Sequence, residues 1–205
     1  MSKTLITIDG PSGVGKTTIG KRLATELNLE FFSSGLLYRA LALHMIKTNS
    51  FNLNEFEIVS NNPVVCKVDG NVYKEESLYT PEINTKSSEI AQLSEIRIVV
   101  SNVLQFLFNN LNTGLVVEGR DMGSVVFKEA DLKIYLDASE VIRSERRLAQ
   151  SENKESVDDL RARDSRDINR KISPLVIADD AIVINNENKS IDEVIKIIKE
   201  NLKLL

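Results

Sequence analysis

The chain is poor in the residues that build disulfides and metal cages. Among its 205 residues there is one cysteine, Cys66, and one histidine, His44. A single cysteine can form neither an internal disulfide nor a cysteine-built metal site. His44 lies within an apolar helical pattern, which predicts a structural role for it.

Long apolar runs are missing too. None approaches the ~20 residues needed to span a bilayer, and the N-terminus lacks the cationic region, apolar stretch and small-residue cleavage site of a secretory signal. We therefore expect a cytoplasmic protein with no membrane partner. The length fits one domain, residues 1–205, with a sizeable core.

Positive charge is not in excess, and aromatic residues are few. The formal net charge is −4 and aromatics make up 5% of the chain, so the composition argues against a nucleic-acid partner. Arginine is nevertheless concentrated, because seven of the eleven arginines lie between Arg143 and Arg170. Acidic residues are interleaved there, so this stretch is either a solvated helical face or a surface that binds phosphate.

Apolar strands alternate with helical patterns along most of the chain. Strands are predicted at residues 4–8, 31–32, 115–117, 132–136 and 181–184, and helices at 16–27, 35–46 and 191–202. Strands that are apolar on both faces and alternate with helices predict an α/β fold, with a parallel β-sheet core flanked by helices.

Two segments interrupt this alternation. Between two β-prone runs stands Asp69-Gly70, a strong hairpin signal that is foreign to a parallel sheet, so residues 50–96 are predicted to form an inserted subdomain. The arginine-rich residues 143–171 are too polar for a core and too regular for a disordered segment. We expect two helices there that form a mobile lid.

A glycine-rich loop, GPSGVGKTT, follows the first predicted strand. It fits G-x-x-x-x-G-K-[ST] between a strand and a helix, where backbone N–H groups and the helix dipole cradle phosphates. Lys16 would reach the β- and γ-phosphates, and the Thr17 hydroxyl would bind Mg²⁺. The predicted triphosphate-binding residues of the loop are Gly10, Pro11, Ser12, Gly13, Val14, Gly15, Lys16, Thr17 and Thr18.

Several classes of nucleotide-binding protein share such a loop. A GTPase would carry Asn-Lys-x-Asp, and the near match at residues 188–192 has its aspartate one position late in a segment that opens a helix. A motor ATPase would show a strand ending in an acidic pair. The strand ending at Asp137 continues as Asp137-Ala-Ser-Glu140, which resembles a helix-capping box. A small kinase is therefore the favoured class.

Three further stretches carry charge at turns: SSGLLYR from Ser33, EGRDMG from Glu118 and RDSRDINR from Arg163. In the third, Arg163, Asp167 and Arg170 have the i, i+4, i+7 spacing of one helical face. An intrahelical salt bridge would give the same spacing, but two arginines around one carboxylate favour anion binding.

With these motifs in order, the chain resembles the bacterial type of cytidylate kinase, which phosphorylates CMP and dCMP with ATP. The resemblance rests on GPSGVGKTT, SSGLLYR, EGRDMGSVVF, KIYLDAS and RDSRDINR, and it covers nearly the whole chain. It implies that residues 50–96 belong to an enlarged nucleoside-monophosphate-binding domain. It also implies ATP as the phosphoryl donor, Mg²⁺ as the metal, and a monomer.

The resemblance implies roles for individual residues. Cytosine would be read by Ser88, Arg97 and Asp121, because a carboxylate suits the N4 amino group and a guanidinium suits N3 and O2. The acceptor phosphate would contact Ser34, Arg39, Arg120 and Arg170, and the sugar would lie near Arg163 and Asp167. Lys16, Arg120, Arg163 and Arg170 would be the catalytic residues.

The chain also departs from the family pattern. Aspartate is frequent in the family where this chain has Ser33 and Glu118; Glu118 keeps the charge needed to hold Mg²⁺ through water, on a longer arm. Three lid arginines on one helical face, Arg143, Arg146 and Arg147, are the candidates for contact with ATP.

These residues predict in-line transfer of the γ-phosphoryl group of ATP to CMP or dCMP. Cations would stabilise the charge of the transition state and a closed lid would exclude water. The alternatives are another small P-loop kinase, for example one acting on shikimate, and a nucleotide-dependent binding switch without turnover.

Overall fold

Two compact units make up the chain, and each is described by itself. The first comprises Met1–Phe32 and Leu111–Leu205, and the second comprises Ser33–Asn110. The structure is a computed structural model that describes residues 3–50, 54–150 and 156–203.

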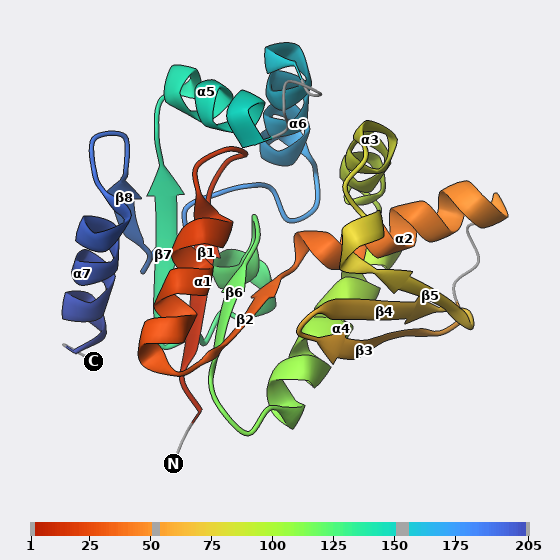
Figure 1. The fold of residues 1–205 in the computed structure, drawn as a ribbon, viewed down its shortest axis with the longest axis horizontal. Helices are drawn as coiled ribbons and strands as arrows, with labels where there is room; N and C mark the ends of the chain where they lie inside the picture. The colour runs from red at the N-terminus through yellow and green to blue at the C-terminus, as the bar shows by residue number, and fades with distance from the viewer. Residues whose placement is uncertain (1–2, 51–53, 151–155, 204–205) are drawn as a thin grey trace. The chain divides into compact units, whose positions relative to one another are not determined.

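The first unit is built on a five-stranded sheet in the order β2-β6-β1-β7-β8 (Figure 1). The strands are β1 (Leu5–Asp9), β2 (Glu30–Ser33), β6 (Leu115–Glu118), β7 (Leu132–Asp137) and β8 (Ile182–Asn185). β1 pairs in parallel with β6 and β7, and β7 pairs in parallel with β8. All five predicted strands and the α/β class are confirmed.

Two helices pack their apolar stripes against this sheet. α1 (Lys16–Leu27) and α7 (Ile191–Leu202) have the predicted bounds, and their side chains Leu23 and Ile198 are fully buried beside Ile8 of β1. Ser190 caps α7 through a capping box with Glu193. This confirms that the Asn188–Asp192 segment opens a helix.

The arginine-rich segment contains two helices, as predicted. They are α5 (Glu140–Gln150) and α6 (Val157–Asn169). Arg170 lies just beyond α6 with an extended backbone, at φ −65° and ψ 141°, so its predicted place on one helical face with Arg163 and Asp167 is wrong. The predicted capping box is also wrong, because Glu140 is the first residue of α5 instead of the third and the Ser139 hydroxyl donates to Glu187.

The second unit contains the predicted hairpin. β4 (Val64–Val68) and β5 (Asn71–Lys74) are joined by Asp69 and Gly70, both at positive φ, and β3 (Phe56–Asn61), which was not predicted, completes the three-stranded sheet. The unit also has α2 (Gly35–Thr48), η1 (Glu75–Ser77), α3 (Pro81–Ile90) and α4 (Ser94–Asn110). It is wider than the expected insert at 50–96.

His44 is buried on α2, where its Nδ1 lies 3.0 Å from the Tyr73 hydroxyl of β5. The histidine therefore ties a helix to the hairpin, in line with the structural role predicted for it. Among the described residues, no single helix is long and apolar enough to cross a membrane; α3 and α4 reach that length and composition only together, across a bend of 100°.

Replacing Leu23 with alanine tests the packing of α1 on the sheet. Because the side chain is fully buried, Leu23→Ala should lower the free energy of unfolding by about 3 kcal/mol through lost burial and a residual cavity. Val141 on α5 is exposed, so Val141→Ala should change it by less than about 0.5 kcal/mol. Urea denaturation measures both, and equal effects would contradict this packing.

Candidate active site

The glycine-rich loop connects β1 to α1. Gly15 is the N-cap of α1 with φ 93°, and the Lys16 side chain is buried against the loop, where Nζ donates to the carbonyls of Gly10 (2.8 Å) and Pro11 (2.7 Å). A helix N-terminus and a cation therefore sit at one loop, the arrangement that binds phosphate.

Neighbouring segments hold the loop closely. Gly13 has φ 76°, and a Cβ there would collide with the carbonyl oxygen of Arg143 in α5. On the other side, Nδ2 of Asn186 donates to the carbonyl of Val14 at 2.7 Å. Glycine at position 13 is required both by the positive φ and by this close approach.

Thr17 and Glu118 lie in contact. The Thr17 hydroxyl donates to Oε1 of Glu118 at 2.7 Å, so the longer arm of glutamate reaches the residue predicted to bind Mg²⁺. The described residues contain no group of three or more His, Cys, Asp or Glu side chains that could form a cage. A hydroxyl and one carboxylate fit Mg²⁺, which keeps several waters and binds substrate phosphates.

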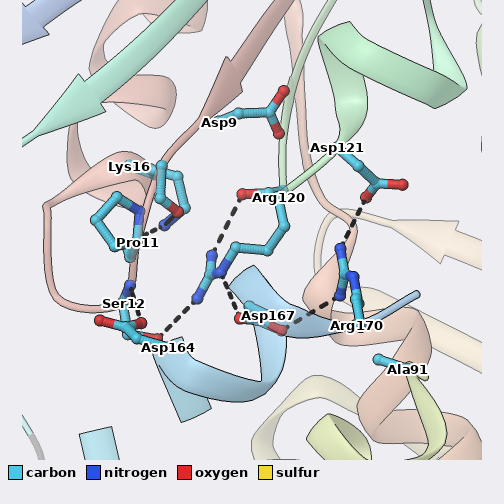
Figure 2. A network of polar contacts seen from close by, with 12 residues as sticks. Asp9, Pro11, Ser12, Lys16, Ala91, Arg120, Asp121, Asp164, Asp167 and Arg170 are labelled. Atoms are coloured by element: carbon cyan, nitrogen blue, oxygen red, sulfur yellow. Dashed lines mark hydrogen bonds and ion pairs between the residues drawn. The ribbon is translucent and has the colours of Figure 1, made fainter. Parts of the chain in front are cut away.

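A chain of alternating charges extends from the loop (Figure 2). The Arg120 guanidinium donates to the Ser12 hydroxyl oxygen (2.8 Å) and to Asp167 (2.9 Å). The other oxygen of Asp167 accepts from Arg170 at 3.2 Å, and Nη2 of Arg170 lies 3.8 Å from Asp121. Arg120, Asp121, Asp167 and Arg170, from different predicted motifs, are therefore brought together.

Electrostatics keep this chain charged. Burial by itself raises the pKa of Asp167, but Arg120, Arg163 and Arg170 hold it below its ordinary value. Burial lowers the pKa of Arg120, yet the charges of Asp167 and Asp164 raise it overall. Lys16 has a pKa well below its ordinary value, because it is buried and Arg120 and Arg163 are near. Asp167 and Asp164 therefore keep Arg120 charged, whereas a phosphate bound beside Lys16 would favour its charged form.

The arginines of α5 differ in what they contact. Arg143 is buried and donates to the carbonyls of Ala138 (3.1 Å) and Ser12 (2.9 Å), and it is paired with Asp164. Asp164 also accepts from the backbone N–H of Ser12 at 3.0 Å. Arg143 and Asp164 therefore tie α5 and α6 to the phosphate loop.

Arg146 contacts the segment that follows β8. Its guanidinium donates to Oδ1 (2.9 Å) and the carbonyl (3.1 Å) of Asn186, whose side chain also holds Val14. Sequence reasoning missed Asn186; its place directly after a parallel strand, at the edge where α/β sheets bind ligands, is the signal that could have found it.

Asp9 was also missed. This last residue of β1 is 5% exposed, and its carboxylate accepts the backbone N–H groups of Met122 (2.9 Å) and Gly123 (2.8 Å). Burial raises the pKa of Asp9 to about 6, with a smaller contribution from Asp121 and against the lowering by the two N–H groups. An acidic residue that ends a buried strand was the available signal.

The second unit positions two predicted arginines over aromatic rings. Arg39 donates to Asn84 Oδ1 (3.0 Å) and stacks over Tyr79 at 5.2 Å. Arg97 donates to the carbonyl of Ala91 (2.9 Å) and stacks over Tyr38 at 5.6 Å. Ser34 and Ser88 are buried, at the N-cap of α2 and on α3 respectively.

Comparison with known proteins decides the family. The family model described as "Cytidylate kinase" matches residues 6–204. The chain belongs to the cytidylate kinase family.

Curated relatives match this chain over nearly all of their length. A cytidylate kinase of Chlamydia caviae is 38% identical over 207 residues, covering 94% of each chain, and one of Clostridioides difficile is 32% identical over 218 residues, covering both chains completely. A solved shikimate kinase from Acinetobacter baumannii, with bound shikimate, has a TM-score of 0.51 at 16% identity and covers 99% of this chain and 94% of that one. It shows the kinase fold alone.

The buried carboxylate of Asp9 gives this chain a testable pH dependence. Its pKa is raised from 3.8 to about 6, so the folded state binds this proton more tightly than the unfolded state, and stability from this group falls as pH rises from about 4 to above 6. Relative to Asp9→Asn, the wild type should lose about 3 kcal/mol over that range, at about 1.4 kcal/mol per pKa unit.

Urea denaturation across that pH range measures the difference. Asp131 accepts the Leu5 N–H at the opposite end of β1, so Asp131→Asn is the matched control for the loss of a carboxylate that accepts a backbone N–H of this strand. A difference between wild type and Asp9→Asn that does not vary with pH would contradict the raised pKa.

Proposed function

We propose that this chain transfers the γ-phosphoryl group of ATP to the 5′-phosphate of CMP or dCMP, giving ADP and CDP or dCDP. The observation that carries the proposal is the buried chain of alternating charges that starts at Ser12 of the phosphate loop and runs through Arg120, Asp167 and Arg170 to Asp121. This chain of contacts links the loop proposed to bind ATP with Arg120 and Arg170, which suit a second phosphate, and with Asp121, which suits a base.

On the donor side, the N–H groups of residues 13–18 and Lys16 would bind the ATP phosphates. Thr17, and Glu118 through water, would hold Mg²⁺. When bound, Mg²⁺ would neutralise charge on the transferred phosphoryl group. Lys16 now donates to loop carbonyls, which keeps its ammonium at the loop where a phosphate would compete for it.

On the acceptor side, Arg120 and Arg170 would bind the 5′-phosphate, joined by Ser34 and Arg39. The acceptor phosphate is already anionic at neutral pH, so no strong general base is required. The difficulty is to bring two polyanions together, and guanidiniums fixed in place beforehand stabilise the developing charge without reorganising. Asp167 supplies that fixation by accepting from both arginines.

Asp121 would select the base. It would accept from the N4 amino group of cytosine, while Ser88 and Arg97 would bind the N3 and O2 edge. Uracil presents O4 there, so two acceptors would face each other. Arg163 and Asp167 would lie near the sugar, and both CMP and dCMP remain substrates of this proposal.

The lid residues would support the donor site. Arg143 contacts the Ser12 carbonyl and Asp164, so it would also hold the loop in place. Arg143, Arg146 and Arg147 stay the candidates for contact with ATP. A closed lid would exclude water as a competing acceptor. A monomeric state and a cytoplasmic location stay predictions.

A substrate panel tests the proposed reaction. With ATP and Mg²⁺, a coupled assay should give a kcat/KM for CMP or dCMP roughly ten- to a hundredfold above that for UMP, as an acceptor–acceptor clash of about 1–3 kcal/mol requires. Faster use of AMP, UMP or shikimate would favour another small kinase. ATP binding without ADP formation from any acceptor would favour a switch.

Replacing Asp121 tests the base reader. Asp121→Ala should bring the CMP and UMP values of kcat/KM to within about threefold of each other, because the carboxylate that penalises O4 is gone. The KM for ATP should stay within about threefold of wild type. Asp158 on α6 has an exposed side chain, so Asp158→Ala should keep the preference. Unchanged discrimination in Asp121→Ala would contradict the assignment.

A further inference from the structure

We infer that Asp9 is a positioning residue for acceptor specificity, because it holds the backbone that carries Asp121. The inference deepens the proposed function and rests on it, since it concerns the discrimination between cytosine and uracil. Asp9 lies at the end of β1, ahead of the phosphate loop, and contacts the segment after β6.

The contact uses both oxygens of the carboxylate. Oδ1 accepts from the N–H of Met122 and Oδ2 accepts from the N–H of Gly123. At the start of the same segment, the N–H of Gly119 donates to the carbonyl of Ile8 at 3.0 Å. Residues 119–123 are therefore attached to β1 at both ends, with Arg120 and Asp121 between the two attachments.

Gly123 makes the attachment possible. A Cβ at this position would lie 2.8 Å from Oγ1 of Thr7 and 3.2 Å from Cγ and Cδ of Lys133. Neither contact is normal for a Cβ, so a side chain would push the backbone away from β1 and from Asp9. Glycine is needed here because the side chains of Thr7 and Lys133 fill the space that a Cβ would take, and its φ is not in the left-handed region.

The far side of Asp121 is fixed as well. Its carbonyl accepts from the N–H groups of Val125 (2.9 Å) and Val126 (3.1 Å), within the π-helical turn η2 (Met122–Val126). The peptide after Asp121 is therefore held at its N–H by Asp9 and at its C=O by this turn. Two independent restraints set the direction in which the Asp121 side chain leaves the backbone.

The chemistry explains an aspartate at position 9. Two parallel N–H donors need two acceptors, and an ionised carboxylate provides them on one planar group. An asparagine has one acceptor, and its amide N–H₂ would face the second donor. Keeping a buried carboxylate beside Asp121 opposes folding, so an isosteric neutral residue would be preferred if only packing mattered.

The test compares two variants that loosen the same attachment from opposite sides. Asp9→Asn removes one acceptor, and Gly123→Ala pushes the peptide away while Asp9 stays intact. Asp131→Asn is the matched control, because Asp131 Oδ2 also accepts a backbone N–H of β1, that of Leu5 at 2.7 Å, at the opposite end of the strand.

The expected result is a loss of discrimination. In Asp9→Asn and Gly123→Ala, the ratio of kcat/KM for CMP to that for UMP should fall by about tenfold, which corresponds to about 1.4 kcal/mol. Asp131→Asn should keep the wild-type ratio. Where turnover is too slow to measure, the ratio of dissociation constants for CMP and UMP replaces it. A merely structural role would lower stability and leave the ratio unchanged.

Amide hydrogen exchange provides a readout that needs no substrate. The N–H groups of Met122 and Gly123 should exchange faster in Asp9→Asn than in wild type, whereas the N–H of Gly119, which donates to Ile8, should change less. If Asp9→Asn does not fold, the ratio of kcat/KM for CMP to that for UMP in Gly123→Ala and in the conservative variant Asp9→Glu tests the inference instead.

The outcomes separate the inference from the function on which it rests. A wild-type chain that does not prefer CMP to UMP would overturn the proposed function. A wild type that prefers CMP, and loses this preference in Asp121→Ala while a folded Asp9→Asn and Gly123→Ala keep it, would overturn the inference alone.

Discussion

The site depends on one carboxylate that lies between two guanidiniums. Asp167 accepts from Arg120 through one oxygen and from Arg170 through the other. Two buried arginines so close together would otherwise repel each other and need water, and neither could be kept in place for a phosphate. Because Asp167 neutralises part of their charge, the pair stays buried, with Arg163 and Lys16 nearby.

The parallel sheet explains why these groups meet. β1, β6 and β7 run in the same direction, so Asp9, Glu118 and Asp137 all stand at the carboxyl edge, where loops and helix N-termini offer backbone donors. The phosphate loop leaves β1 at this edge and the Arg120–Asp121 segment leaves β6. Asp9 connects the two by hydrogen bonds, so the loop proposed to bind ATP and the segment proposed to recognise the base are fixed by the same residue.

The elements and site residues that have a local sequence signal were predictable. The bounds of α1 followed from the loop motif and a stripe of leucines and isoleucines. The turn at Asp69-Gly70 followed from the Asp-Gly pair, because these two residues adopt the positive φ that a tight hairpin requires. β3 carries no clear alternation and is fixed by pairing with β4. Lys16 and Thr17 came from spacing, whereas Asp121 and Arg97 needed a family resemblance. Asp9 and Asn186 carry only the signal of a strand end, and the partners of Asp9, Asp164 and Asn186 lie far away in sequence, which no local pattern reports.

Activity of Asp167→Asn toward CMP tests the account most directly. This isosteric change keeps the packing and removes the charge that holds Arg120 and Arg170, so kcat/KM for CMP should fall by about a hundredfold, since breaking a buried pair costs several kcal/mol. Asp158→Asn, the same substitution at an exposed site on α6, should leave it unchanged. A folded Asp167→Asn variant with kcat/KM within about twofold of wild type would contradict the claim that this carboxylate organises the site.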